Sequence, residues 1–210
     1  MSRLRTEAER LFREADRFSR MNDRAGAVSC FQEMLALEGL EQKEPLAAEC
    51  AHWGLAELLV QSRDMDRAES HLREAIRLNP GEAGYRTELG SLYNYQAKFD
   101  EAAAELEESL RLRPDHPQTV RLLGWVRFMS GDHARGRELL ERAFHLDDSN
   151  TGILNDLAVC LVEGGKLDRA LSLVDRACTM DPKSPLLRSF REMIIQRRRQ
   201  KRTKGRGPAD

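Results

Sequence analysis

The sequence lacks any long hydrophobic run. No segment approaches the roughly 20 consecutive apolar residues that a membrane-spanning helix needs. Residues 1–7 also lack the apolar core that a secretory signal peptide carries. We therefore expect a cytoplasmic protein without a transmembrane segment.

Cysteine is scarce, and it is never arranged as a redox or metal-binding pair. The chain has four cysteines, and none stands in a Cys-x-x-Cys spacing, which favours reduced and mostly buried thiols. The close pair Cys50 and His52 lacks two further ligands at a spacing suited to zinc. We therefore predict that the protein has no metal site and no cofactor.

Catalytic motifs are missing as well. The sequence contains no Gly-x-Ser-x-Gly, no phosphate-binding loop and no His-Glu-x-x-His. Its five histidines are scattered, and the carboxylates of residues 101–108 follow a helical spacing that is typical of a solvated face. We therefore predict that the protein is not an enzyme.

Aromatic residues make up only 6% of the chain, whereas charged residues make up 33%. This mixture suits a helical protein with thin core layers and wide solvated faces. The net charge is −1, but residues 197–206 contain seven lysines or arginines. An acidic body therefore carries a basic tail.

Residue types recur along the chain with a period of 34 residues. One column holds the small residues Ala56, Gly90, Gly124 and Ala158. The other columns in the same frame are Ala68, Ala102, Gly136 and Ala170; Leu55, Leu89, Leu123 and Leu157; Leu72, Leu106, Leu140 and Val174; and Pro80, Pro114 and Pro182, with Asp148 in place of one proline. A fixed period of this length predicts stacked supersecondary units.

Each unit is predicted to be a pair of antiparallel helices that buries its apolar face only by stacking on its neighbours. Small residues stand where two helix axes cross most closely. Proline ends the second helix because it lacks an amide proton. Asp66, Asp100 and Asp168 are expected just before the second helices, where a carboxylate can cap free amides.

The period and its columns resemble the tetratricopeptide repeat. Leu89-Gly90 with Tyr93, Ala102 and Leu106 is the best-matching stretch, and the resemblance covers residues 49–184. It implies an all-α fold, a right-handed superhelical α-solenoid, and a non-catalytic module that binds another protein. The family's first helices line a concave groove, which holds an extended peptide or a helix of the partner.

The predicted repeats are not all equal. A looser first repeat carries Ala15, Phe18 and Ala27, and about seven additional residues near 41–47 separate it from the second, as a longer loop or a longer helix. The organisation that we predict is a solenoid over 1–196 with repeats near 8–41, 49–82, 83–116, 117–150 and 151–184, a capping helix over 185–202, and a partly disordered basic tail over 197–210. These segments comprise eleven helices.

The predicted groove residues are the outward positions between the core columns of the first helices. They are Trp53, Thr87, Ser91, Asn94, Tyr95, Arg121, Trp125, Phe128, Met129 and Asn155, and the same positions also hold Phe12, Asp16, Ser19, Glu57, Val60, Val159 and Val162. Trp, Tyr and Arg often carry binding energy at interfaces, so this set predicts a peptide-binding groove of an adaptor, scaffold or chaperone. In the alternative, Trp53 and Trp125 pack sideways onto neighbouring helices or contact the chain's own N-terminal segment.

One subtype of the family clamps the acidic C-terminal peptides of heat-shock chaperones with cationic groove residues. The corresponding positions here include Trp53, Glu57 and Glu88 instead of lysine and arginine. We therefore predict an apolar and aromatic groove without that clamp.

The basic tail supports a second hypothesis. Its cations are Arg197, Arg198, Arg199, Lys201, Arg202, Lys204 and Arg206. They could bind nucleic acid, an anionic membrane surface or an acidic protein, which would make the chain a tethering module, or they could form a solvated helix end. Because no aromatic residues lie between them, base-specific reading of RNA is not expected. A homo-oligomeric scaffold is a third alternative.

Overall fold

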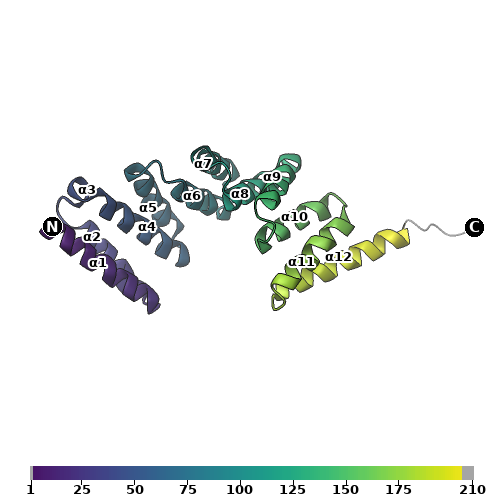
Figure 1. The fold of residues 1–210 in the computed structure, drawn as a ribbon, viewed down its shortest axis with the longest axis horizontal. Helices are drawn as coiled ribbons and strands as arrows, with labels where there is room; N and C mark the ends of the chain where they lie inside the picture. Colours follow the sequence, from purple (N-terminus) through teal and green to yellow (C-terminus); the bar gives the residue numbers. More distant parts are fainter. Residues whose placement is uncertain (1, 205–210) are drawn as a thin grey trace, which may run out of the picture. The chain divides into compact units, whose positions relative to one another are not determined.

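The computed structural model describes residues 2–204 and the side chains up to Lys201. Within this range the chain forms twelve helices and no strand (Figure 1), which confirms the predicted all-α fold. The helices are α1 (Arg3–Arg20), α2 (Arg24–Leu35), α3 (Leu40–Lys43), α4 (Pro45–Gln61), α5 (Met65–Leu78), α6 (Ala83–Tyr95), α7 (Phe99–Leu112), α8 (Pro117–Met129), α9 (His133–Leu146), α10 (Thr151–Glu163), α11 (Leu167–Met180) and α12 (Pro185–Lys204).

The chain divides into two compact units. The first ends at Leu112 and contains α1 to α7, and the second begins at Arg113 and contains α8 to α12. Each unit is described by itself below. The expected organisation, one solenoid over 1–196 followed by a tail, stays a prediction.

Both units are built from pairs of neighbouring helices. In the first unit the pairs are α1–α2, α4–α5 and α6–α7, and α2 and α5 also contact the first helix of the following pair. In the second unit the pairs are α8–α9 and α10–α11, and α9 contacts α10. Since α6, α8 and α10 begin at Ala83, Pro117 and Thr151, the pairs follow the 34-residue period of the sequence.

The large apolar columns of the sequence form the core of each unit. Their members are buried: Leu55, Leu72, Leu89, Leu106, Leu123, Leu140, Leu157 and Val174. In the second unit α12 completes this core, because its Leu187 and Ile194 are buried against α10 and α11. The helix predicted over 185–202 thus closes the last pair, and it continues to Lys204.

The additional residues after the first repeat form a helix of their own, so the predicted count of eleven helices was wrong. Gly39 adopts a left-handed conformation with φ 77°, which only glycine does at little cost, and the four-residue helix α3 follows. Buried Leu40 anchors α3. Pro45 then begins α4, which has 17 residues compared with 13 in α6. Both expected effects of the insertion, a longer connection and a longer helix, are therefore present.

The helix caps lie two residues earlier than the sequence predicted. The side chains of Asp23, Asp64 and Asp132 accept hydrogen bonds from the backbone amides three residues later, at the starts of α2, α5 and α9. The carboxylates expected at these caps, Asp66, Asp100 and Asp168, instead lie inside the first turns of α5, α7 and α11. There they still interact favourably with the positive end of the helix dipole.

The turn inside each helix pair uses a left-handed residue at one fixed position. These residues are Asn22, Arg63, Ala97, Gly131 and Gly165. Left-handed backbone is cheap for glycine, tolerable for asparagine and unfavourable for other side chains. The turns after α4 and α6 are therefore the strained ones, because they place arginine and alanine there.

Replacing Ala97 with glycine should raise the free energy of unfolding by about 1 kcal/mol, because the glycine relieves the left-handed strain at φ 58°. Ala104 is the matched control: it is exposed in the middle of α7, where glycine should cost about 1 kcal/mol. Urea denaturation of both variants measures the two changes. Effects of the same sign would contradict this account of the turn.

Candidate protein-interaction surface

The first unit presents a hollowed face over α1, α4 and α6, which we call the α1–α4–α6 face. It contains three neighbouring depressions, all of which lie within the first unit. The Cys50 pocket, of about 460 Å³, lies between α1, α2 and α4. The Trp53 hollow, of about 310 Å³, lies mainly between α1 and α4, and the Tyr95 hollow, of about 410 Å³, lies between α4 and α6.

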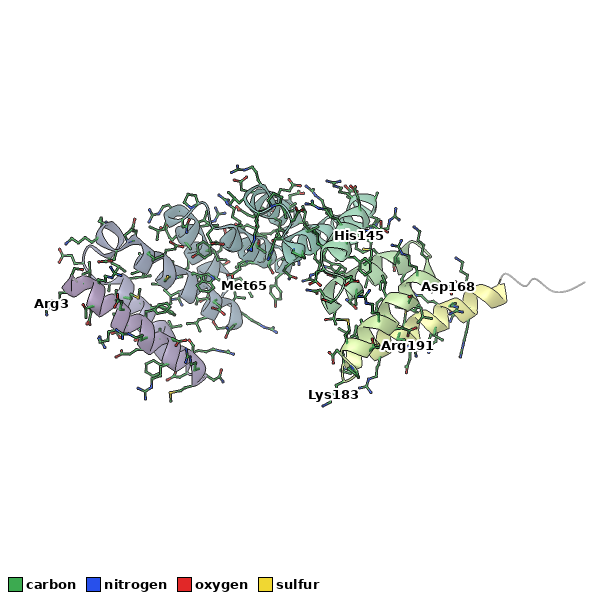
Figure 2. The ribbon with its side chains drawn as sticks, viewed as in Figure 1. Arg3, Met65, His145, Asp168, Lys183 and Arg191 are labelled. Atoms are coloured by element: carbon green, nitrogen blue, oxygen red, sulfur yellow. The ribbon has the colours of Figure 1, made fainter. Side chains whose placement is uncertain are left out.

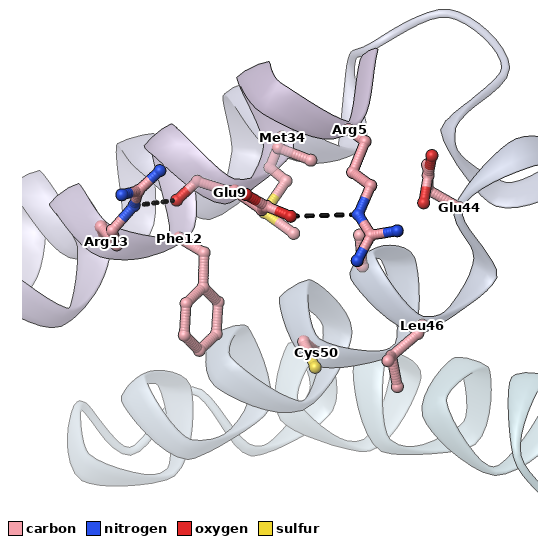
Figure 3. A pocket seen from close by; sticks show the side chains of 10 residues that line it. Arg5, Glu9, Phe12, Arg13, Met34, Glu44, Leu46 and Cys50 are labelled. Atoms are coloured by element: carbon pink, nitrogen blue, oxygen red, sulfur yellow. Dashed lines mark hydrogen bonds and ion pairs between the residues drawn. The ribbon is translucent and has the colours of Figure 1, made fainter. Parts of the chain in front are cut away.

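The Cys50 pocket is mostly apolar. Phe12 of α1 and Leu46 of α4 flank it and are 41% and 69% exposed, and the thiol of Cys50 lies at its base on α4 (Figure 3). Charged groups stand at its edge, where Arg5 Nε donates to Glu9 Oε1 over 3.0 Å (Figure 3). Burial raises the pKa of the Cys50 thiol, which therefore stays protonated at neutral pH. The pocket suits an apolar side chain.

The three depressions adjoin one another. The Cys50 pocket and the Trp53 hollow share Phe12 and Cys50, and the Trp53 and Tyr95 hollows share Glu57 and Gln61. A chain segment that lies along this face can therefore contact all three. Side chains of the first helices α1, α4 and α6 supply most of this surface, and α2, α5 and residues between helices supply the rest.

Trp53 lies on this face but also packs sideways. Its indole Nε1–H donates to both carboxylate oxygens of Glu88 over 3.2 Å, and its ring centroid is 6.4 Å from that of Tyr85. Trp53 remains 37% exposed, so the contact with α6 covers it only in part. Packing around the Glu88 carboxyl raises its pKa against the hydrogen bond from Trp53, and the charge of Glu57 adds to the rise.

The other predicted groove residues of α6 fall into two groups. Ser91 and Tyr95 line the Tyr95 hollow, and Tyr95 is 62% exposed. Thr87 is half-buried and has a structural role, because its hydroxyl bonds to Ala83 O and to the Ser109 hydroxyl. Asn94 is half-buried and lies outside the lining of the three depressions.

The predicted groove residues of the second unit mostly serve its own packing. Arg121 forms an ion pair of 2.5 Å with Asp156 of α10, and both side chains are largely buried. Phe128 is buried, and Trp125 is half-buried against the core of the unit, so neither presents a free ring. The prediction that Arg121 and Phe128 are available to a partner is wrong, because Arg121 pairs with Asp156 of α10 and Phe128 is buried in the core.

Met129 and Asn155 complete the predicted set. Met129 is exposed at the end of α8. The Asn155 amide nitrogen donates weakly to Asp156 Oδ1 over 3.4 Å. Because Trp125 contacts the core, its replacement by alanine would disturb folding as well as binding, and it is a poorer test of binding than Tyr95.

The contact of Trp53 and the contact of Arg121 join residues at the same separation in the sequence. Trp53 contacts Glu88, and Arg121 contacts Asp156, each across 35 residues between successive first helices. A search for polar pairs one period plus one residue apart would have found both. Leu46 and Cys50 of the pocket could not have been found in this way, because they lie in or beside the insertion that shifts the register.

Two histidines also come together, although the sequence suggested scattered ones. His52 Nδ1 and His71 Nδ1 lie 2.9 Å apart between α4 and α5, and burial lowers the pKa of both rings. Neutral imidazoles can form this hydrogen bond, with one as donor and the other as acceptor. No group of three or more potential ligands suited to a metal ion occurs in the part of the chain that the structure describes.

The predicted basic tail begins as the last turns of α12. Arg198 pairs with Asp168 at the start of α11 over 2.9 Å, and Arg197 approaches Glu163 of α10 at 3.5 Å (Figure 2 shows Asp168 beside α12). Lys201 Nζ donates to Gly165 O over 3.4 Å. Several of these cations thus contact the unit's own helices. Arg199 is exposed, the side chains of Arg202 and Lys204 are not described, and Arg206 lies outside the described residues.

Known proteins share parts of this sequence and this fold. BBSome complex member BBS4 from Bos taurus is 28% identical over 109 residues, which are 52% of this chain and only 21% of that protein. MamA from Desulfovibrio magneticus RS-1 is similar in structure, with a TM-score of 0.72, 16% identity, and coverage of 85% of this chain and 97% of that one. TTC0263, a tetratricopeptide-repeat protein of Thermus thermophilus, gives a TM-score of 0.69, 18% identity, and coverage of 90% and 99%. At these identities the two structures show the fold alone.

No helix in the range 2–204 is long and apolar enough to span a bilayer.

Two family models, both described as tetratricopeptide repeat, match most of the chain. One covers residues 12–83 and 87–151, and the other covers residues 127–194. The helix pairs and their 34-residue period agree with these two family matches. The chain therefore belongs to the tetratricopeptide-repeat family, whose members are generally non-catalytic modules of protein–protein interaction.

Proposed function

We propose that the protein is a non-catalytic adaptor, scaffold or chaperone that binds a peptide segment or helix of a partner on the α1–α4–α6 face. The observation that carries this proposal is the run of three adjoining depressions on one face of the first unit. Exposed Phe12 and Tyr95 stand toward opposite ends of this run. Exposed aromatic side chains beside apolar depressions are typical of the anchors of protein interfaces.

The second unit contributes differently under this proposal. Its predicted groove residues are tied into the Arg121–Asp156 pair and the core, so it offers fewer free side chains. The alternative of a tethering module stays a prediction. Of the described cations of the tail, Arg197, Arg198 and Lys201 contact the second unit and add no support for it, and Arg199 is exposed.

Replacing Tyr95 with alanine should weaken partner binding by about 2 kcal/mol, because an exposed tyrosine at the edge of a hollow is a favoured anchor. Peptides selected from an unbiased displayed library against the wild-type protein provide the ligands. Isothermal titration then measures their affinity for the variant, and circular dichroism checks that the variant is folded.

Leu186 supplies the matched control. It is an exposed apolar residue on α12 of the second unit and does not line any of the three depressions, so its replacement by alanine should leave the affinity unchanged. Selected peptides that bind both variants as tightly as they bind the wild type would show that the α1–α4–α6 face is not the binding surface.

A further inference from the structure

We propose that the segment bound on the α1–α4–α6 face carries an apolar side chain that enters the Cys50 pocket and a lysine or arginine side chain that lies beside Glu57 and Glu88. The bound segment belongs to another protein chain. This inference rests on the proposed function, because it defines the chemistry of the segment bound at the same face.

The Cys50 pocket accounts for the apolar part of the segment. Its volume of about 460 Å³ is comparable to a small-ligand site, and apolar groups dominate its walls. Its rim has matched charges, since Arg5 pairs with Glu9. Exposed Phe12 and Leu46 beside it are apolar surface that a side chain such as leucine or phenylalanine would cover.

The other end of the face has negative charge that the protein neutralises only in part. Glu57 and Glu88 both line the Tyr95 hollow, and neither forms an ion pair with a cation of the described residues. On the neighbouring helices, Glu69 of α5 pairs with Arg73, and Glu105 of α7 pairs with Arg86. Glu57 and Glu88 differ from these two in having no cation paired with them in the described part of the chain.

A cation of the partner would complement this end in two ways. Two carboxylates oppose a single guanidinium in the hollow, that of Arg63, so its balance of charge is negative. The rings of Trp53 and Tyr95 stand at the same part of the face, and aromatic rings attract lysine and arginine side chains. An acidic segment would instead meet like charge. Charge complementarity therefore selects a basic segment.

The order of these features explains why one segment can use both ends. The Trp53 hollow shares residues with each neighbour and joins the apolar end to the acidic end. An extended peptide can cross it without leaving the surface. The expected ligand is thus an apolar segment interrupted by a basic residue.

Three pools of synthetic peptides of equal length test this inference on the full chain. The first combines leucine and phenylalanine with lysine, the second has glutamate in place of lysine, and the third has serine in place of the apolar residues. Only the first pool should bind well, and added salt should weaken its binding. It should change the fluorescence of Trp53, a change that disappears in Trp53→Phe, and slow the alkylation of Cys50 but not of Cys178.

The double variant Glu57→Gln/Glu88→Gln should bind the first pool about fivefold or more weakly, through loss of two charge contacts. The matched control is Glu38→Gln/Glu101→Gln, which makes the same change of charge at exposed positions of the first unit outside the face. This control should bind like the wild type.

The outcomes separate this inference from the proposed function. If the glutamate pool or the serine pool binds as tightly as the first and Tyr95→Ala abolishes that binding, the face is a binding site but the basic-apolar chemistry is wrong. Equal loss of affinity in the two double variants would also overturn the chemistry. If none of the pools binds, this inference is overturned, and the proposed function still depends on the library-selected peptides and their response to Tyr95→Ala.

Discussion

Replacing Asp156 with alanine should lower the free energy of unfolding by about 3 kcal/mol, because it leaves a largely buried arginine without its counter-ion. Asp156 of α10 accepts from Arg121 Nη1 of α8 over 2.5 Å, and its side chain is only 11% exposed. Burial raises the pKa of the Asp156 carboxyl even with Arg121 against it. The cost of removing the carboxylate from water is therefore high, and the guanidinium that remains would be the main source of the destabilisation.

Urea denaturation in a Trp53→Phe background measures this loss, because the remaining tryptophan, Trp125, packs in the second unit. The matched control is Asp175→Ala. Asp175 also pairs with an arginine of a neighbouring helix, Arg191, at 2.5 Å, but both members of this pair are exposed. This change should cost at most about 1 kcal/mol.

A double variant shows whether the unpaired charge is the cause. Arg121→Met with Asp156→Leu removes both charges from the buried site and should restore a large part of the stability that Asp156→Ala loses. A double variant as unstable as the single one would mean that the pair acts through shape rather than charge. Equal losses in Asp156→Ala and Asp175→Ala would contradict the role of burial.

The helix pairs could be predicted from the sequence because burial repeats with the chain. A position that faces the core in one pair faces it in the next, so Leu89 and Leu123 carry the same signal. The insertion carries no such signal. Four residues make a single helical turn, and one buried leucine, Leu40, does not distinguish α3 from a loop. The number of helices could therefore not be obtained from periodicity.

The candidate site was predicted less well than the fold, for a related reason. Periodicity shows which positions point outward from the first helices, and Tyr95 is indeed exposed there. It does not show what lies opposite. Arg121 points outward from the core columns, but the next first helix places Asp156 against it. Whether an outward residue is free depends on its neighbour one repeat later, and side-chain length and charge decide that contact.

Replacing Gly136 with alanine should destabilise the second unit by about 2 kcal/mol, although the sequence column alone suggests a harmless change. The same column holds Ala68, Ala102 and Ala170 in the other pairs. At Gly136 of α9, an added Cβ would lie 2.7 Å from the backbone nitrogen of Phe128 and 2.8 Å from Gly124 O. These neighbours are backbone atoms of α8, so the two helices would have to separate, which costs more than the higher helix propensity of alanine returns.

Gly164→Ala is the matched control, since an added Cβ there meets no atom closer than 3.4 Å. It should change the free energy of unfolding by less than about 0.5 kcal/mol. Thermal and urea denaturation of both variants measure the difference. If Gly136→Ala is as stable as the wild type, α8 and α9 can move apart to admit the methyl group at no cost in stability. The close crossing would then follow from the absence of a side chain at Gly136 and would not be a requirement of the fold.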